Sequence, residues 1–345
     1  MIVVTPKQMK YLESKADSKG NTYEILMETA GKKLSERLYD ILKNKHNSIL
    51  FLCGNGNNAG DCFVADRYLS GKNVKCVIAM LCGEPKTDIS KLNFNKLNNM
   101  EIIYEKEVIK SRIASNSFDL IVDGVFGTGF HGDIPDDIRE VFDVCRDAQI
   151  IAVDVPSGGN CRTGYVSDGT LKADETITFG FQKFGMTQYP LKSYCGNINI
   201  ADIGISEDFA EDFDCIIKQS DFEYARNIIP EKTPDSHKGT YGRLLLICGS
   251  ESMPGACIMA AEAAARSGVG LLEIAAPKSV LGIIASRLPE AMLCPLETDN
   301  DGFFTENNYN KIIAHSKKAT AVLIGCGIGE TENTKKACKT TCLRH

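Results

Sequence analysis

Three glycine-rich segments carry the polar side chains best suited to chemistry. GNGNNAGDC (54–62), DGVFGTGFHGD (123–133) and DVPSGGNCRTG (154–164) each stand at the end of a short apolar run. Glycines let a backbone approach a ligand closely, and the amides that open a following helix can bind a phosphate. The pattern predicts a ligand site built from three loops.

The same segments contain hard oxygen donors. Asn58, Asp123 and Ser157 offer an amide carbonyl, a carboxylate and a hydroxyl. Oxygen-only ligation suits an alkali or alkaline-earth cation better than a transition metal. Turn and cap hydrogen bonds are the commoner use of these residue types, so the residues alone leave both interpretations open.

The first segment also fits a loose dinucleotide fingerprint, with Gly54, Gly56 and Ala59 at its three small positions. A dehydrogenase of this kind carries an acidic residue about 20 positions further on, at the tip of the second strand, to bind the ribose. Here the tip of that strand, residues 79–83, has no acidic residue, and the first acid after it is Glu84, which already lies in a loop. An ordinary NAD-dependent dehydrogenase is therefore disfavoured.

Alternating elements position these loops. Apolar runs at 48–54, 74–81, 119–124 and 149–155 are separated by amphipathic segments, and 175–179 and 197–202 predict further strands. Continuous apolar runs are typical of strands buried on both faces. The first half is thus expected to be a Rossmann-like, doubly wound parallel α/β sheet, with the three loops at its carboxyl edge. Thr5, Pro6 and Gln8 predict a capped helix before it, ending near Gly20.

The second half starts a new alternation after a polar stretch between about 208 and 242. Strands are predicted at 243–249, 271–275 and 320–325, with helices at 255–267 and 279–288. We therefore expect two α/β domains, at 1–216 and 217–345.

Composition limits the classes of partner. The 345 residues carry a net charge of −6, with 43% hydrophobic and 24% charged residues, and no apolar run approaches the ~20 residues of a membrane span. Fourteen cysteines are scattered without a CxxC pair, and there are five histidines. We expect a cytoplasmic protein with reduced thiols that binds neither nucleic acid nor membrane.

Four short motifs of the sequence resemble those of a known enzyme family. LMETAG (26–31), GNGNNAGD (54–61), DGVFGTGF (123–130) and VDVPSG (153–158), in this order, resemble the NAD(P)HX epimerase family over roughly residues 1–216. The family interconverts the R and S epimers of NADH or NADPH hydrated at C6 of the nicotinamide ring. The resemblance implies that potassium binds at Asn58, Asp123 and Ser157, and that substrate contacts Asn57, Asn58, Ala59, Gly60, Asp61, Gly127, Thr128, Gly129, Phe130, His131, Gly132, Asp133 and Asp154.

The chain departs from the family pattern twice. Ala59 and Cys62 replace glycines of the first loop, and Gly159 to Cys161 stand where the family has a hydrophobic residue and an aspartate. Our hypothesis makes Asp154 the acid/base, because epimerising C6 requires a proton to move on or off its oxygen, whether hydroxide leaves or the C6–N1 bond opens. The alternative is a carboxylate that only holds a ribose hydroxyl or caps a loop.

Segments 237–250 and 253–271, together with GCGIG (325–329), resemble the start of the ADP-dependent NAD(P)HX dehydratase, which has a ribokinase-like fold. The family's later GTGD segment and most of its ADP or ATP site have no counterpart here. We therefore expect an incomplete ribokinase-like domain without dehydratase activity, with an exposed sheet edge. The tail 335–345 is not expected to continue as an amphipathic helix.

Two competing functions belong to other classes. The epimerase-type fold also serves as a non-catalytic interaction module, which would not need the cation ligands or Asp154. A small-molecule kinase would need the missing GxGD segment. Family analogy further favours a homo-oligomer that acts on the small molecule NAD(P)HX.

Overall fold

The computed structural model describes residues 2–42, 48–98, 100–115, 117–229, 231 and 233–342, without the side chains of 337 and 340–342. Contacts divide the chain into two compact units, Met1–Ile228 and Ile229–His345. The division lies beyond the expected boundary at 216/217, because contacts group helix α7 (Phe222–Ile228) with the first unit.

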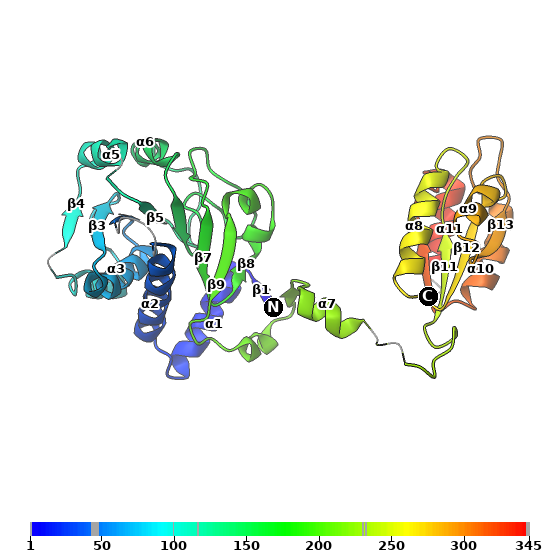
Figure 1. The fold of residues 1–345 in the computed structure, drawn as a ribbon, viewed down its shortest axis with the longest axis horizontal. Coiled ribbons are helices and arrows are strands. Elements are labelled where there is room, and N and C mark those ends of the chain that lie inside the picture. Colours follow the sequence, from blue (N-terminus) through cyan, green and yellow to red (C-terminus); the bar gives the residue numbers. More distant parts are fainter. Residues whose placement is uncertain are drawn as a thin grey trace. The chain divides into compact units, whose positions relative to one another are not determined.

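The first unit is built on a parallel sheet of seven strands (Figure 1). Its order is β4 (Glu101–Ile103), β3 (Lys75–Met80), β2 (Ser48–Cys53), β5 (Leu120–Gly124), β6 (Ile150–Val153), β7 (Glu175–Phe179) and β9 (Asn197–Ala201). All predicted strands are present, and β4 is an addition. The strand order reverses between β2 and β5, and ligands of open α/β sheets bind at such a reversal.

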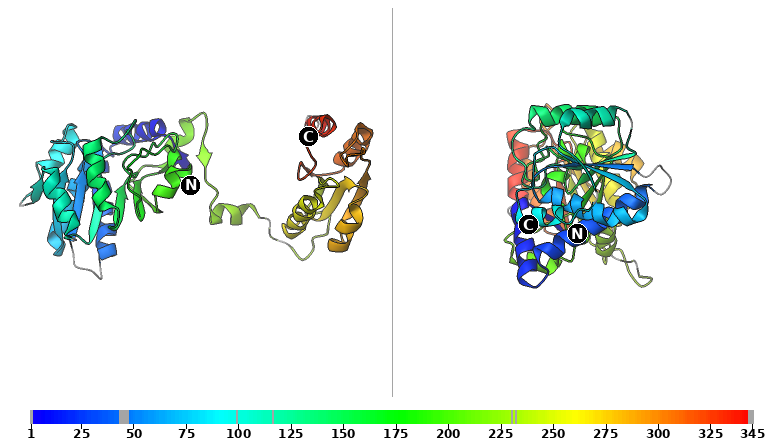
Figure 2. Two further views of the ribbon diagram at one scale, coloured as in Figure 1. Left: turned by 90° about the horizontal axis from the view of Figure 1, so that it is seen from above. Right: turned by 90° about the vertical axis from the view of Figure 1, so that its left-hand side faces the viewer.

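Helices cover both faces of this sheet (Figures 1 and 2), which confirms the doubly wound fold. One face packs against α1 (Pro6–Ser18), α2 (Tyr23–Leu42) and α3 (Asn57–Leu69). The other packs against α5 (Lys106–Ala114) and α6 (Asp136–Cys145). The short α4 (Asp88–Phe94) lies beside α3.

Helix α1 begins as predicted. Thr5 accepts a hydrogen bond from the Gln8 amide, and the Gln8 side chain accepts one from the Thr5 amide, with Pro6 in the first turn. The chain leaves the helix through Gly20, whose φ of +95° favours glycine.

A second, small sheet was not predicted. Its order is β10 (Ile217–Lys218), β1 (Ile2–Val4) and β8 (Gln182–Lys183), and β1 runs parallel to β8 with Val4 opposite Lys183. Because α1 follows β1 directly, this pairing holds α1 close to the carboxyl end of β7, which precedes β8.

The second unit contains a parallel sheet of β13 (Met292–Leu296), β12 (Leu271–Pro277), β11 (Arg243–Ile247) and β14 (Ala321–Ile324). One face packs against α8 (Pro254–Arg266) and α9 (Leu281–Arg287), and the other against α10 (Tyr309–Ser316). β13 was not predicted. β13 and β14 are the edge strands of this sheet, and the side chain of Leu323 on β14 is 40% exposed.

The expectation for the tail was wrong over the described residues. Helix α11 (Glu332–Cys342) includes most of it, and Cys338 packs against the core of the second unit. The last three residues lie outside the described range. No helix in the described part of the chain combines the length and apolar character that crossing a membrane requires.

Candidate active site

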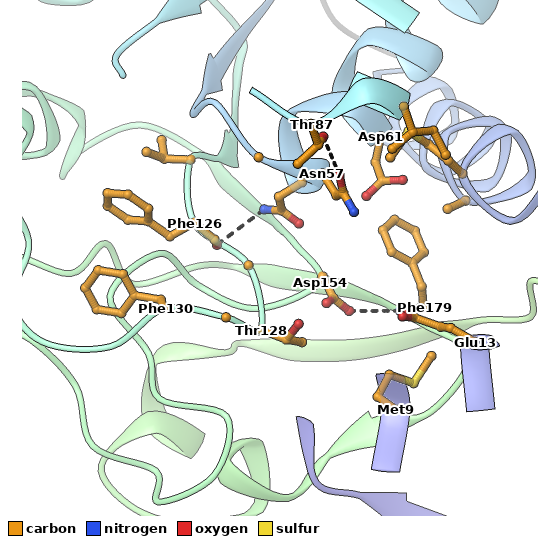
Figure 3. Close-up of a pocket in the computed structure, with 18 of the residues that line it drawn as sticks. Met9, Glu13, Asn57, Asp61, Thr87, Phe126, Thr128, Phe130, Asp154 and Phe179 are labelled. Carbon is orange, nitrogen blue, oxygen red and sulfur yellow. Dashed lines mark hydrogen bonds between the residues drawn. The ribbon is translucent and has the colours of Figure 1, made fainter. Parts of the chain in front are cut away.

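A pocket of about 680 Å³ opens at the carboxyl ends of the central strands, where the order reverses (Figure 3). Its volume lies within the usual range for small-molecule sites. The loops after β2 and β5 form much of its wall, Asp154 follows β6, and α1 and α2 close another side. Ten of the expected substrate-contacting residues line it: Asn57, Asn58, Asp61, Gly127, Thr128, Gly129, Phe130, His131, Asp133 and Asp154.

Three expected residues do not line the pocket. Ala59 is fully buried on the side of α3 that faces the core, and Gly60 faces α2, where an added Cβ would lie 2.6 Å from the Met27 sulfur. Gly132 lies in the loop after β5 without reaching the pocket wall. In this structure Ala59 and Gly60 therefore serve the packing of α3, and Gly132 serves the shape of its loop.

The two departures in the first loop have a local explanation. Ala59 stands in the first turn of α3, where a methyl group is tolerated, as expected. Cys62 is fully buried against Gly124, and a Cβ at Gly124 would lie only 2.3 Å from its sulfur. The cysteine thus fills the space that the glycine of β5 leaves.

The expected cation ligands come together around one backbone segment. Asp123 is fully buried and accepts hydrogen bonds from the Ser157 amide at 2.8 Å and the Ser157 hydroxyl at 2.5 Å. The Phe126 amide donates to Ser157 Oγ at 2.8 Å. Asn58 Nδ2 donates to the carbonyls of Phe126 at 3.3 Å and Val153 at 3.1 Å.

The charge of Asp123 has no cationic side-chain partner within the described ranges. Its bonds come from Ser157 and from the Val125 amide. Burial raises the pKa of Asp123 to about 6, against the opposing effect of the Ser157 hydrogen bonds. A buried carboxylate, a hydroxyl and nearby carbonyl oxygens are a donor set that fits a monovalent cation.

Asp154 lies directly after β6 with a φ of +65°, in the left-handed region that aspartate adopts more readily than most residues. Its Oδ1 accepts hydrogen bonds from Thr178 Oγ1 at 3.0 Å and the Phe179 amide at 3.3 Å. It also forms an ion pair with Lys183, whose side chain is 1% exposed. The Lys183 ammonium further donates to the Phe179 carbonyl at 3.0 Å.

Lys183 and Glu13 are pocket residues that sequence reasoning missed. Lys183 follows the predicted strand 175–179 closely, and that position at a strand end was the available signal. Glu13 had none, because it lies on a helix far from the three loops. Both depend on the small sheet, which contains Lys183 and orients α1.

Glu13 and Asp61 share the electrostatic environment of Asp154. Burial raises the pKa of Glu13 to about 7, with a further contribution from Asp154, whereas Lys183 opposes the shift. Burial also raises the pKa of Asp61, and the negative charges of Asp154 and Glu13 act in the same direction. Figure 3 shows the three carboxyl groups around one part of the pocket, beside the ring of Phe179.

Aromatic surfaces complete the pocket. The rings of Phe126 and Phe130 lie with their centroids 4.8 Å apart at 33°, and Tyr23 and Phe179 also line the wall. Planar apolar surfaces next to polar groups are suited to a ligand that contains flat rings.

Comparisons with known proteins match both units. Residues 23–185 match the family described as the YjeF-related protein N-terminus, and residues 244–345 match the NAD(P)H-hydrate dehydratase family. A bifunctional NAD(P)H-hydrate repair enzyme of Dictyoglomus turgidum is 31% identical over 97% of the chain. The chain is thus similar to bifunctional NAD(P)H-hydrate repair proteins over nearly all of its length. It carries their YjeF-related domain and part of their dehydratase domain.

The chain spans just under two thirds of the length of such repair proteins, 64–66% for three of them. A yeast protein of known structure is similar in fold to the first unit, with a TM-score of 0.54 and 21% identity over 64% of this chain and 96% of its own. An ADP/ATP-dependent NAD(P)H-hydrate dehydratase of Bacillus subtilis, crystallised with ATP and Mg²⁺, is 35% identical over 34% of this chain and 39% of its own, with a TM-score of 0.28.

Proposed function

We propose that the first unit interconverts the R and S epimers of hydrated NADH and NADPH. The observation that carries this proposal is the pocket at the strand-order reversal, where the start of α3, the loop after β5 and the end of β6 bring Asn58, Asp61, Gly127 and Asp154 together. The flat rings of Phe126, Phe130 and Phe179 suit the bases of a dinucleotide, and the backbone amides at the start of α3 suit its pyrophosphate.

Asp154 is the proposed acid/base at C6. It lines the pocket at a strand end, and its ion pair with Lys183 fixes the carboxylate. Its hydrogen bonds with other described residues use only Oδ1. The second oxygen is thus available to a substrate hydroxyl. General acid/base transfer of this kind is worth ~10²–10⁴-fold in rate.

We also propose a potassium ion bound by Asn58, Asp123 and Ser157. Bound potassium would neutralise Asp123 and fix the loops after β5 and β6. This potassium site is supported by the buried carboxylate of Asp123, which has no cationic side-chain partner among the described residues, and by the oxygen atoms around it. Replacing potassium by choline is expected to slow turnover, and Asp123→Asn is expected to remove most of that difference.

The test is epimer exchange. Purified protein is mixed with R-NADHX, an excess of an S-specific dehydratase and ADP, and NADH formation is followed by absorbance. Protein-dependent consumption of the R epimer supports the proposal, provided that Asp154→Asn still binds substrate without turning it over. A well-folded protein that gives no acceleration contradicts the proposal and favours the interaction module. An Asp154→Asn variant of near-normal rate would contradict only the acid/base role of Asp154.

The second unit belongs to a dehydratase family, whose Bacillus subtilis relative is ADP/ATP-dependent. Our expectation that this chain lacks dehydratase activity stays a prediction. It is tested by incubating S-NADHX with the chain and ADP, without any added dehydratase. A cytoplasmic location and assembly into a homo-oligomer are likewise proposals.

A further inference from the structure

Epimerisation at C6 requires both a proton donor and a proton acceptor, and these act on opposite faces of the ring if hydroxide leaves. If hydroxide leaves, the C6–O bond breaks with its electron pair on oxygen, the N1 lone pair forms a C6=N1 bond, and an acid converts the departing hydroxide to water. A water then forms the new C6–O bond from the other face while the π pair returns to N1. Its surplus proton passes to a base.

The ring-opening route has the same requirement. A base takes the hydroxyl proton, the O–H electron pair becomes the second bond of an aldehyde, and the C6–N1 bond breaks with its pair on N1. An acid then protonates N1. After rotation about the C5–C6 bond, closure reverses both transfers. A single carboxylate fixed by an ion pair does not meet both needs.

Three carboxyl groups surround this part of the pocket in very different environments. Asp154 receives hydrogen bonds from Thr178 and the Phe179 amide and pairs with Lys183, so its negative charge is stabilised. Asp61 is 8% exposed, and no residue in the described ranges donates a hydrogen bond to its carboxyl group. The same holds for the half-buried Glu13, also within the described ranges.

The charges around these groups do not balance. Among the described residues, Lys183 is the only lysine or arginine that lines the pocket. Its ammonium already forms an ion pair with Asp154. Lys10 acts on Glu13 from the same helix. Three ionised carboxylates facing one buried ammonium would repel one another, so one proton is expected to remain on the Asp61–Glu13 pair.

We propose that Asp61 is the proton donor of the reaction, that Asp154 is the acceptor, and that Glu13 is a positioning residue which keeps the proton on Asp61. This inference rests on the proposed epimerase function. Asp61 is the donor because it is the more buried of the two and stands on α3 next to the loop that lines the substrate site. Burial and the charges of Asp154 and Glu13 raise its pKa, which is the direction that an acid at neutral pH requires.

The test is the pH profile of epimer exchange by the full chain. Asp61→Asn is expected to lower the turnover rate by ~10²–10⁴-fold while R-NADHX binding, measured by calorimetry, changes only a few-fold. In Glu13→Gln the like charge beside Asp61 is gone, so Asp61 loses its proton at lower pH. The alkaline limb of the profile is then expected to move down by about one pH unit.

Glu24→Gln is the matched control, because Glu24 is an exposed carboxylate on α2 that does not line the pocket. Its profile should overlay that of the unaltered protein. The proposal is overturned if Asp61→Asn keeps its turnover, or if Glu13→Gln lowers the rate equally at every pH. If the unaltered protein shows no exchange at any pH, the epimerase function itself fails and this inference falls with it.

Discussion

At the scale of single residues, the buried ion pair between Asp154 and Lys183 joins stability to function. Lys183 is 1% exposed, and its ammonium also binds the Phe179 carbonyl. Removing one partner of a buried pair leaves an uncompensated charge, at a typical cost of about 3–5 kcal/mol. We therefore expect Lys183→Met to lower the free energy of unfolding by an amount at or below this range, because Asp154 keeps some contact with water.

A double-mutant cycle separates the pair from the cavity left by each change. Urea unfolding followed by circular dichroism should show that Lys183→Met combined with Asp154→Asn is more stable than Lys183→Met alone. Equal stabilities of these two variants would mean that the Asp154 carboxylate carries no cost in the folded protein when Lys183 is absent.

Asp66 on α3 is a second buried carboxyl group, with a pH dependence of its own. It is fully buried, and no N–H or O–H in the described ranges bonds to it, although the Cys76 thiol lies beside it. Burial raises its pKa to about 7. Between pH ~4, where an unfolded aspartate titrates, and pH 7 the folded chain holds the additional proton, so stability falls as the pH rises through this window and levels off above it.

Asp66→Asn removes this titration. The variant should gain stability relative to the unaltered protein as the pH rises from 5 to 8, by roughly 1–3 kcal/mol. Thermal unfolding at both pH values measures the difference, with Glu24→Gln as the exposed control. A difference that does not change with pH would show that Asp66 is already ionised in the folded protein.

At the scale of elements, the close contact of α2 with α3 positions the pocket. A Cβ at Gly31 would lie 2.4 Å from the Val64 Cβ and 2.7 Å from the Asp61 carbonyl oxygen. Because one of these atoms is backbone, Gly31→Ala must push the helices apart and displace Asp61. We expect a loss of ~1–3 kcal/mol in stability and a lower rate of epimer exchange.

Gly71→Ala is the control for this change, since nothing lies within 4 Å of an added Cβ there. Its stability should stay within about 0.5 kcal/mol of the unaltered protein. Gly31→Ala with unchanged melting temperature and rate would mean that α2 and α3 can separate without consequence for the site.

Elements also mark how far the sequence could predict this fold. Strands such as β2 and β5 are buried on both faces, which requires a continuous apolar run that is readable locally. β1, β8 and β10 have two or three residues each, and they exist because partners distant in sequence meet. The loop residues of the pocket were predictable from their glycines, whereas Glu13 was not, because which face of α1 meets the pocket depends on this pairing.

At the scale of the whole molecule, each unit has cores of its own. The clusters that include Phe51, Phe63 and Phe142 belong to the first unit, and those that include Ile274 and Phe304 belong to the second. The described residues between α7 and β11 are mostly exposed, and Lys238 is one of these exposed residues. All residues that line the pocket come from the first unit.

This organisation predicts that epimer exchange resides in the first unit alone. Brief digestion with a lysine-specific protease should cut after Lys238, because exposed polar connections are the preferred sites of proteolysis. The N-terminal fragment, purified and identified by mass spectrometry, should retain the exchange rate and the alkaline limb of the undigested chain, since Glu13, Asp61, Asp154 and Lys183 all remain in it. A fragment that stays folded but loses exchange would show that the second unit supports the site, and the assignment of the reaction to the first unit would then be wrong.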